Sequence, residues 1–149
     1  MSINLLGIDL AKEVFQLHGV DQKGRAVVRR RVRRDDLIKT IEELGRFTIA
    51  MEACSTSHWW AREFCQRGYE VKLIAPQFVK PFVKANKNDA NDAEAIAEAA
   101  MRPSMRFVSV KQQWQLDLQA QHRVRARLVR NRTALSNEIR GFLQENGIV

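Results

Sequence analysis

Two aspartates, Asp89 and Asp92, lie three residues apart in a stretch from 84 to 100 whose later residues are strong helix formers. Asn88 or Asp89 suits the N-cap position of that helix. Residues i and i+3 share one face of a helix, so both carboxylates are expected to point the same way. Such a pair can bind a cation, or it can simply cap the helix, because acidic residues favour a helix N-terminus.

Two further carboxylates follow apolar segments that are typical of buried strands. Asp9 ends the segment 3–9, and Glu52 follows the segment 47–51. By analogy with the ribonuclease H-like arrangement, the first strand lies beside the fourth. Asp9 and Glu52 would then meet at the carboxyl ends of parallel strands, where open α/β sheets bind ligands. The helix with Asp89 and Asp92 would close the third side.

Four carboxylates within a few ångströms repel one another and are stable chiefly when cations neutralise them. Oxygen ligands select hard ions, so Mg²⁺ or Mn²⁺ is expected. Two such ions about 3.5–4 Å apart can activate a nucleophile and stabilise the leaving oxygen at phosphorus. An acidic metal pocket within a basic surface suits a nucleic-acid phosphodiester as substrate.

The elements that must position these residues follow the order strand, strand, strand, helix, strand, helix, strand, helix. This order predicts an α/β fold with a mixed five-stranded sheet and helices on both faces. The strands are expected over 3–9, 14–20, 25–33, 47–51 and 69–74, and the helices over 35–44, 55–67 and 89–101. A proline-bracketed connector is expected over 75–84, and a short extended piece over 107–110.

The third strand carries arginines on one face. Arg29, Arg31 and Arg33 alternate with residues of the other face, including Arg30. One interpretation is an edge strand protected from aggregation by positive charge. The other is a stripe that binds a nucleic-acid backbone, and both stay open.

A long helix is expected from residue 111 to about 145, a region with no proline and no glycine before Gly141. Its apolar positions recur at spacings of three and four, with Gln121 and Asn131 interrupting the row, as in a coiled coil. The helix could pack on its own domain, but its length favours dimerisation, with basic flanks that include Arg123, Arg127 and Arg130. The expected division is therefore 1–110 and 111–149.

Composition favours a nucleic-acid partner. Lys and Arg total 25 against 17 acidic residues, the net charge is +8 and the pI is about 10.1. No segment is apolar enough to cross a membrane, and no secretion signal is visible. Cys54 and Cys65 form no Cys-x-x-Cys pair, so we expect reduced thiols in a cytoplasmic protein and no zinc site.

Several polar residues near the carboxylates allow two roles each. Lys84 and Lys87 flank the acidic loop and either balance its charge or contact phosphate. Trp59 could touch DNA, although tryptophans more often anchor packing. Glu94 and Glu98 are weaker metal-ligand candidates, expected on another face or in solvent.

The chain resembles the DEDD-type insertion-sequence transposases that include the Piv and MooV DNA invertases. The resemblance covers essentially the whole chain, and its most specific part is the core 87–93. The matching motifs are Gly7-Ile-Asp-Leu10, Met51-Glu-Ala-Cys54, the segment 74–84 and the segment 86–97. The resemblance implies a RuvC-like domain that binds Mg²⁺ and acts on DNA, followed by a coiled-coil helix. It also implies that the acidic tetrad falls on Asp9, Glu52, Asp89 and Asp92.

Members of that family are longer and carry a second domain with a serine implicated in strand cleavage. The chain ends at Val149, so it resembles an N-terminal fragment whose activity alone is in doubt. Some members are guided by an RNA encoded by their own element, so the resemblance allows an RNA partner besides DNA.

Three hypotheses follow. The first is a metal-dependent DNA recombinase domain, and the second is a non-catalytic module for nucleic-acid binding and dimerisation. Binding that ignores Mg²⁺ and weakens steeply with salt would favour the second. The third is a sugar-kinase or actin-like ATPase half, opposed by the absence of a second Gly-rich phosphate loop.

Overall fold

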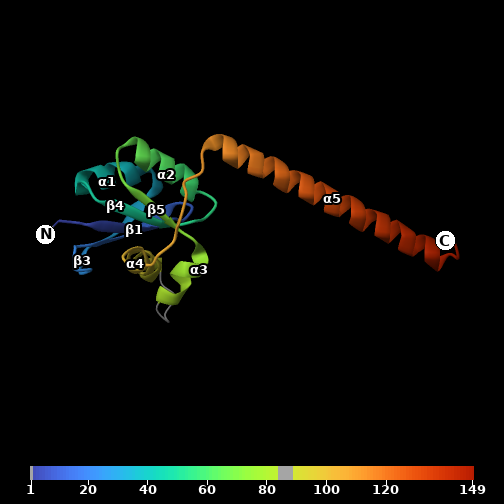
Figure 1. The fold of residues 1–149 in the computed structure, drawn as a ribbon, viewed down its shortest axis with the longest axis horizontal. Helices are drawn as coiled ribbons and strands as arrows, with labels where there is room; N and C mark the ends of the chain where they lie inside the picture. Colours follow the sequence, from blue (N-terminus) through green and yellow to red (C-terminus); the bar gives the residue numbers. More distant parts are fainter. Residues whose placement is uncertain (1, 84–88) are drawn as a thin grey trace. The chain divides into compact units, whose positions relative to one another are not determined.

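The computed structural model describes residues 2–83 and 89–149, and of Asp89 and Ala90 it describes only the backbone. The chain divides into two compact units, Met1–Val110 and Lys111–Val149. The first unit is built on a six-stranded mixed sheet with the order β3-β2-β1-β4-β5-β6 (Figure 1). Its strands are β1 Leu5–Asp9, β2 Val14–Val20, β3 Ala26–Arg33, β4 Thr48–Glu52, β5 Val71–Ile74 and β6 Phe107–Val108.

The first unit's helices lie in two layers. The helices α1 and α2 cover one face of the sheet, and α4 covers the other (Figure 1). Their bounds are α1 Leu37–Leu44, α2 Ser57–Gln66, α3 Pro76–Val79 and α4 Asp89–Ala100, with 3₁₀ turns η1 Arg34–Asp36 and η2 Lys80–Phe82.

The sheet opens as an antiparallel meander and continues in parallel. β1 pairs with β2 and β2 with β3 in antiparallel register, and Gly24 provides the positive φ of 76° in the turn between β2 and β3. β1 and β4 are parallel, as are β4 and β5. Strands β1, β3, β4 and β5 therefore all end at one edge of the sheet, called here the carboxyl edge.

The expected fold class is confirmed, with one addition. The extended piece near 107–110 forms a sixth strand, because Phe107 and Val108 pair with Ile74 and Leu73 of β5. The connector over 75–84 also contains the short helix α3, which Pro76 starts at a position where a missing N–H costs nothing.

Helices α1 and α2 both begin without a side-chain cap hydrogen bond. Asp36 and Thr56 occupy the N-cap positions of α1 and α2, but neither side chain makes a cap hydrogen bond. The 3₁₀ turn η1 leads directly into α1. At α2 the Ser57 hydroxyl accepts a hydrogen bond from the Cys54 N–H at 3.1 Å and donates one to the Cys54 carbonyl at 2.9 Å, which fixes the turn after β4.

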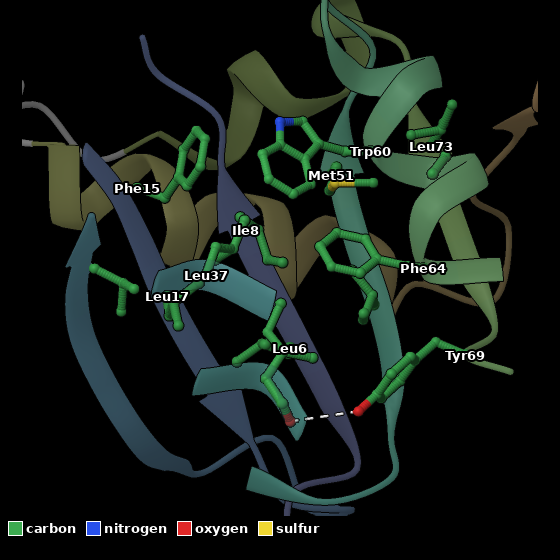
Figure 2. Close-up of a cluster of buried hydrophobic side chains, with 14 residues drawn as sticks. Leu6, Ile8, Phe15, Leu17, Leu37, Met51, Trp60, Phe64, Tyr69 and Leu73 are labelled. Atoms are coloured by element: carbon green, nitrogen blue, oxygen red, sulfur yellow. Dashed lines mark hydrogen bonds between the residues drawn. The ribbon is translucent and has the colours of Figure 1, made fainter. Parts of the chain in front are cut away.

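Strand alternation gives each face of the sheet its own core. Leu6, Ile8 and Met51 point toward α1 and α2, where they meet Phe15 and Phe64 (Figure 2). On the other face, small and aliphatic residues of the sheet meet the alanine-rich side of α4. The sheet contributes Leu5, Ala50 and Ile74, and the helix contributes Ala95, Ile96, Ala97, Ala99 and Ala100. This small-residue interface brings α4 close to the sheet.

Gly7 is the point of closest approach between β1 and α4. A Cβ added at Gly7 would collide with the Ala93 carbonyl oxygen and would lie 2.9 Å from the Ala97 amide nitrogen. Both neighbours are helix backbone, which cannot turn aside as a side chain can. Glycine at this position therefore sets how deeply the first half of α4 sits on the sheet.

The second unit consists mainly of helix α5, Gln113–Glu145. The Gln112 N–H donates a hydrogen bond of 2.9 Å to the Gln115 side chain at its start. No residue of α5 is buried. Among the described residues, none forms a helix long and apolar enough to cross a membrane.

Candidate metal and nucleic-acid site

Asp9 and Glu52 are the last residues of two neighbouring strands, β1 and β4, at the carboxyl edge. Ile8 of β1 lies opposite Met51 of β4, so the next residues, Asp9 and Glu52, end neighbouring parallel strands. Ile8 and Met51 belong to the core under α1 and α2. Because side chains alternate along a strand, Asp9 and Glu52 belong to the opposite face, which α4 covers.

Asp92 approaches Glu52 from the first turn of α4. The pKa of Glu52 is raised, first because the side chain is partly withdrawn from water and second because the negative charge of Asp92 is close. Helix α4 begins at Asp89, so Asp92 lies in its first turn, as the sequence predicts. The structure thus brings Glu52 and Asp92 within electrostatic reach of each other.

Part of the predicted site lies outside the described residues. Lys84 and Lys87 fall in the segment 84–88, and the side chain of Asp89 is likewise not described. Among the side chains that are described, no three His, Cys, Asp or Glu residues lie close enough together to hold a metal ion. The carboxylates Asp9, Glu52 and Asp92 offer only oxygen ligands, which is the donor chemistry that Mg²⁺ and Mn²⁺ take.

The arginine-bearing strand β3 lies at the edge of the sheet. In the register of the meander, Asp9 pairs with Gln16 and Gln16 with Arg31. Because paired residues share a face, Arg31, Gln16 and Asp9 form one row that crosses the sheet under α4 and continues to Glu52. Arg29 belongs to the next row, opposite His18.

A hollow of about 210 Å³ lies along this row. Arg29 borders it and forms a 3.8 Å ion pair with Glu94 of α4, so Glu94 turns toward the edge strand rather than toward Asp92. The other lining residues are Gln16, Leu17, His18, Arg30, Arg31 and Asn91. The hollow thus gathers guanidinium groups at the end of the row formed by Gln16 and Arg31, which is a suitable surface for a phosphate.

The remaining predicted contacts are spread over the chain. Arg33 ends β3 at the carboxyl edge, opposite Val14. Arg123, Arg127 and Arg130 lie exposed on α5, in the second unit.

Sequence reasoning missed Gln16 and Asn91. The alternation of β2 predicts that Gln16 shares a face with His18, but only the strand register shows that this face carries Asp9. Asn91 lies between the two aspartates in sequence, and it lines the hollow because α4 turns that side toward β3.

The six-stranded sheet with its carboxyl-edge acids defines the class of the fold. The first unit resembles Thermus thermophilus RuvC, with a TM-score of 0.52 and 14% identity to the structure "T. thermophilus RuvC in complex with Holliday junction substrate". The match covers 72% of this chain and 100% of that chain. A second structure, "Thermus thermophilus RuvC structure", matches with a TM-score of 0.51. The fold is therefore RuvC-like.

Comparison with sequences gives the family. The family model for DEDD transposases of the IS110 group, described as "Transposase", matches residues 6–147. The chain is 54% identical over its full length to a "Probable family 20 transposase" of Pseudomonas aeruginosa, of which it covers 44%. It is 53% identical over 146 residues to the "Transposase for insertion sequence element IS1111A" of Coxiella burnetii, of which it covers 40%.

The chain belongs to the DEDD transposase family, and the expected resemblance is confirmed. It spans less than half the length of these two relatives. Membership of this family argues against the third hypothesis, in which the chain is half of a sugar kinase or actin-like ATPase.

Proposed function

We propose that this chain is the metal-dependent RuvC-like part of a DNA transposase that acts on phosphodiester bonds. The observation that carries the proposal is that Asp9 and Glu52 end adjacent parallel strands on the face that α4 covers, with Asp92 close enough to Glu52 to add to the rise of its pKa. Like charges held together in this way favour a site that a cation neutralises. Asp89, which starts the same helix, is the fourth proposed ligand.

The proposed ligands for Mg²⁺ or Mn²⁺ are Asp9, Glu52, Asp89 and Asp92. A bound divalent ion would supply Lewis-acid stabilisation of the charge that develops at phosphorus. The carboxylates belong to the α4 face of the sheet. From Asp9 the row continues on that face through Gln16 to Arg31. Arg29, Arg31 and Arg33 then hold the phosphates of the strand on one side of the reacting bond.

The nucleic-acid path includes basic residues beyond the sheet. We assign Lys84 and Lys87, next to the acidic helix start, and Arg123, Arg127 and Arg130, on α5, to backbone contacts. Such contacts fix the position of the nucleic acid and carry no sequence information. DNA is the proposed partner, and the backbone of an RNA strand would contact the same basic side chains.

The test of the site is a calorimetric titration with Mg²⁺ and with Mn²⁺. We expect binding in the parent chain and a loss of at least tenfold in affinity for Asp92→Asn and for Glu52→Gln, because each removes a charged ligand. Glu98→Gln is the matched control, since Glu98 lies on the same helix but pairs with Arg102 at 2.6 Å. Equal binding by all variants would contradict the proposed ligand set.

Activity is tested in a full-length transposase in which the proposed ligands are substituted. We expect Asp9→Asn and Asp92→Asn to abolish transposition while the protein remains folded and bound to DNA. A variant that recombines DNA at the parent rate would show that these carboxylates are not catalytic.

A second candidate function, a non-catalytic module for nucleic-acid binding and dimerisation, is favoured by helix α5. Its apolar residues are exposed instead of packed, with Trp114 64%, Leu128 62% and Phe142 58% exposed. The row from Trp114 to Phe142 repeats at about 3.5 residues, the period of a coiled coil. We therefore propose that α5 pairs with α5 of a second copy. This pairing is compatible with the metal-dependent activity as well as with a purely binding role.

A further inference from the structure

A group of aromatic side chains with one arginine lies at the carboxyl edge, on the sheet face opposite α4. Trp59 stands in the first turn of α2, soon after β4 ends. Arg34 directly follows β3, which ends at the same edge, and Phe15 lies near the start of β2, which begins there. The carboxylates and this aromatic group therefore share one end of the sheet.

Arg34 lies against all three rings of the group. Its guanidinium carbon is 5.9 Å from the centre of the Trp59 ring and 5.2 Å from that of Trp60, and it is 6.0 Å from the ring of Phe15. Trp59 meets Trp60 edge to face, with ring centres 4.7 Å apart. The arginine and the inner tryptophan thus hold the outer ring in one orientation.

Packing explains Trp60 but not Trp59. Trp60 is 3% exposed, stacks on Phe64 and meets Phe15 edge to face (Figure 2). Trp59 remains 45% exposed although it is the neighbouring residue. A large aromatic ring that is held in place and left open to solvent is a surface for another flat ring.

Trp60 also carries an unpaired donor. Within the described residues, its indole N–H is buried and has no hydrogen-bond partner. Figure 2 shows the indole nitrogen on the side of the ring away from Leu6, toward the end of the sheet where β1 finishes. Buried donors are almost always paired, so this indole N–H is a polar group for which the fold supplies no partner, next to the exposed ring of Trp59.

We propose that Trp59 is a stacking platform for one unpaired nucleobase of the DNA strand whose backbone reaches the carboxylates. The inference rests on the proposed function. A base offers a planar ring for Trp59, and the adjacent phosphate offers a charge for Arg34. The turn between Glu52 and Trp59 is short and is fixed by the Ser57 hydroxyl on the Cys54 backbone, so the platform keeps its position relative to the carboxylates.

The experiment measures binding of fluorescent single-stranded DNA by anisotropy, without divalent ions. A set of oligonucleotides replaces one base at a time by an abasic residue and leaves every phosphate in place. In the parent chain we expect one abasic position to weaken binding by about tenfold or more. Trp59→Ala should weaken binding of the intact strand by a similar factor, and it should cancel the penalty at that position.

Trp59→Phe, which keeps a flat ring, is expected to restore most of the affinity and the abasic penalty. Trp114→Ala is the matched control, because Trp114 is an exposed tryptophan of the second unit; its abasic profile should equal that of the parent. The proposal is overturned if Trp59→Ala binds like the parent, if its abasic penalties persist unchanged, or if the parent shows no position-dependent penalty.

Two further arms separate the possible causes. Repeating the series with RNA identifies which polymer supplies the base, since only the polymer that stacks on Trp59 shows the position-dependent loss. The second arm is the metal titration: the DNA-binding assay contains no divalent ion, so its abasic profile does not depend on the metal site. A failed metal titration with an intact profile would therefore overturn the proposed function alone, and the reverse result would overturn the stacking platform alone. Thermal unfolding checks that each variant is folded.

Discussion

At the scale of single residues, the acidic positions are defined by their electrostatic environment. Glu52 ends a strand whose other residues are mostly buried, so its carboxylate is only partly hydrated. Asp92 adds a negative charge nearby and opposes the ionisation of Glu52. A structural carboxylate would normally gain a cationic partner, whereas this pair raises the free energy of the metal-free fold.

The first prediction concerns how the stability of the metal-free protein depends on pH. The pKa of Glu52 is raised by folding, so the folded state binds its proton more tightly than the unfolded state does. The stability contributed by this proton is fully present below the unfolded pKa of Glu52 and is lost as pH rises through the folded pKa. Glu52→Gln should therefore flatten the pH profile and stabilise the metal-free protein at pH 7 by about 0.5 kcal/mol or less, because solvent screens the charges of a partly exposed carboxylate.

Urea unfolding of the metal-free protein from pH 4 to pH 8 measures this effect. Glu98→Gln serves as the control, because its ion pair with Arg102 lies at the surface and should contribute little. Parallel pH profiles for Glu52→Gln and the parent would contradict the prediction.

At the scale of elements, the position of α4 on the sheet decides where Asp92 lies. The helix contacts β1 at Gly7 with its backbone, and its buried side there is almost entirely alanine. Larger residues in either element would separate the helix from the sheet. The close contact is thus a condition for the approach of Asp92 to Glu52.

The second prediction is that Gly7→Ala destabilises the protein by about 1–3 kcal/mol, because the new methyl group meets helix backbone that cannot relax. The variant should also weaken Mg²⁺ binding, since α4 must move away. Gly141→Ala is the opposite control. No atom lies within 4 Å of a Cβ at this helical position, so it should stabilise α5 by about 0.5–1 kcal/mol. Equal effects of the two changes would refute this account of the interface.

The third prediction distinguishes the two faces of the sheet. Arg31→Ala should lower the affinity for single-stranded DNA by about tenfold and reduce the slope of log K against log salt by about 0.7, as expected for one lost phosphate contact. Lys39→Ala is the control with the same charge change, because Lys39 lies exposed on α1, which covers the opposite face of the sheet. Binding measured across a range of salt concentrations gives both slopes. Equal losses of DNA affinity in the two variants would contradict the prediction, because they would show that the positive charge has the same effect on either face of the sheet.

At the scale of the whole molecule, the chain joins a compact α/β unit to a helix that has no core of its own. A 33-residue helix with exposed apolar residues along one row gains little from isolated folding. A partner that covers this row would supply the missing burial. The basic residues between the apolar positions would then remain available to nucleic acid.

The fourth prediction is that the chain forms a dimer through α5 and that Leu128→Glu weakens it by at least tenfold, because a charge then lies in the apolar row. Leu128 is 62% exposed, so the substitution should leave the first unit folded. Ala126→Glu adds the same charge on the other side of the helix and should leave the dimer intact. Sedimentation over a range of concentrations measures both. A parent chain that stays monomeric at high concentration would contradict the pairing.

Local patterns in the sequence predicted most of the elements, the fold class and the family. Alternating and helical spacings are local properties, so they predicted the core of every strand from β1 to β5 and the helices α1, α2, α4 and α5. The motif around Asp89 and Asp92 pointed to the DEDD family, and comparison with known sequences confirmed it.

Which of these residues lie close together became visible in the folded sheet alone. The register of β1 against β2 and β4 joins Arg31, Gln16, Asp9 and Glu52 in one row, and no local pattern contains that register. The closeness of Asp92 to Glu52 depends on the depth of α4 over Gly7, and the ring group at Trp59 depends on three chain segments that end or begin at one edge. The physical reason is that spacing along the chain fixes direction and burial, whereas contacts between distant segments arise from packing the whole sheet and its helices together.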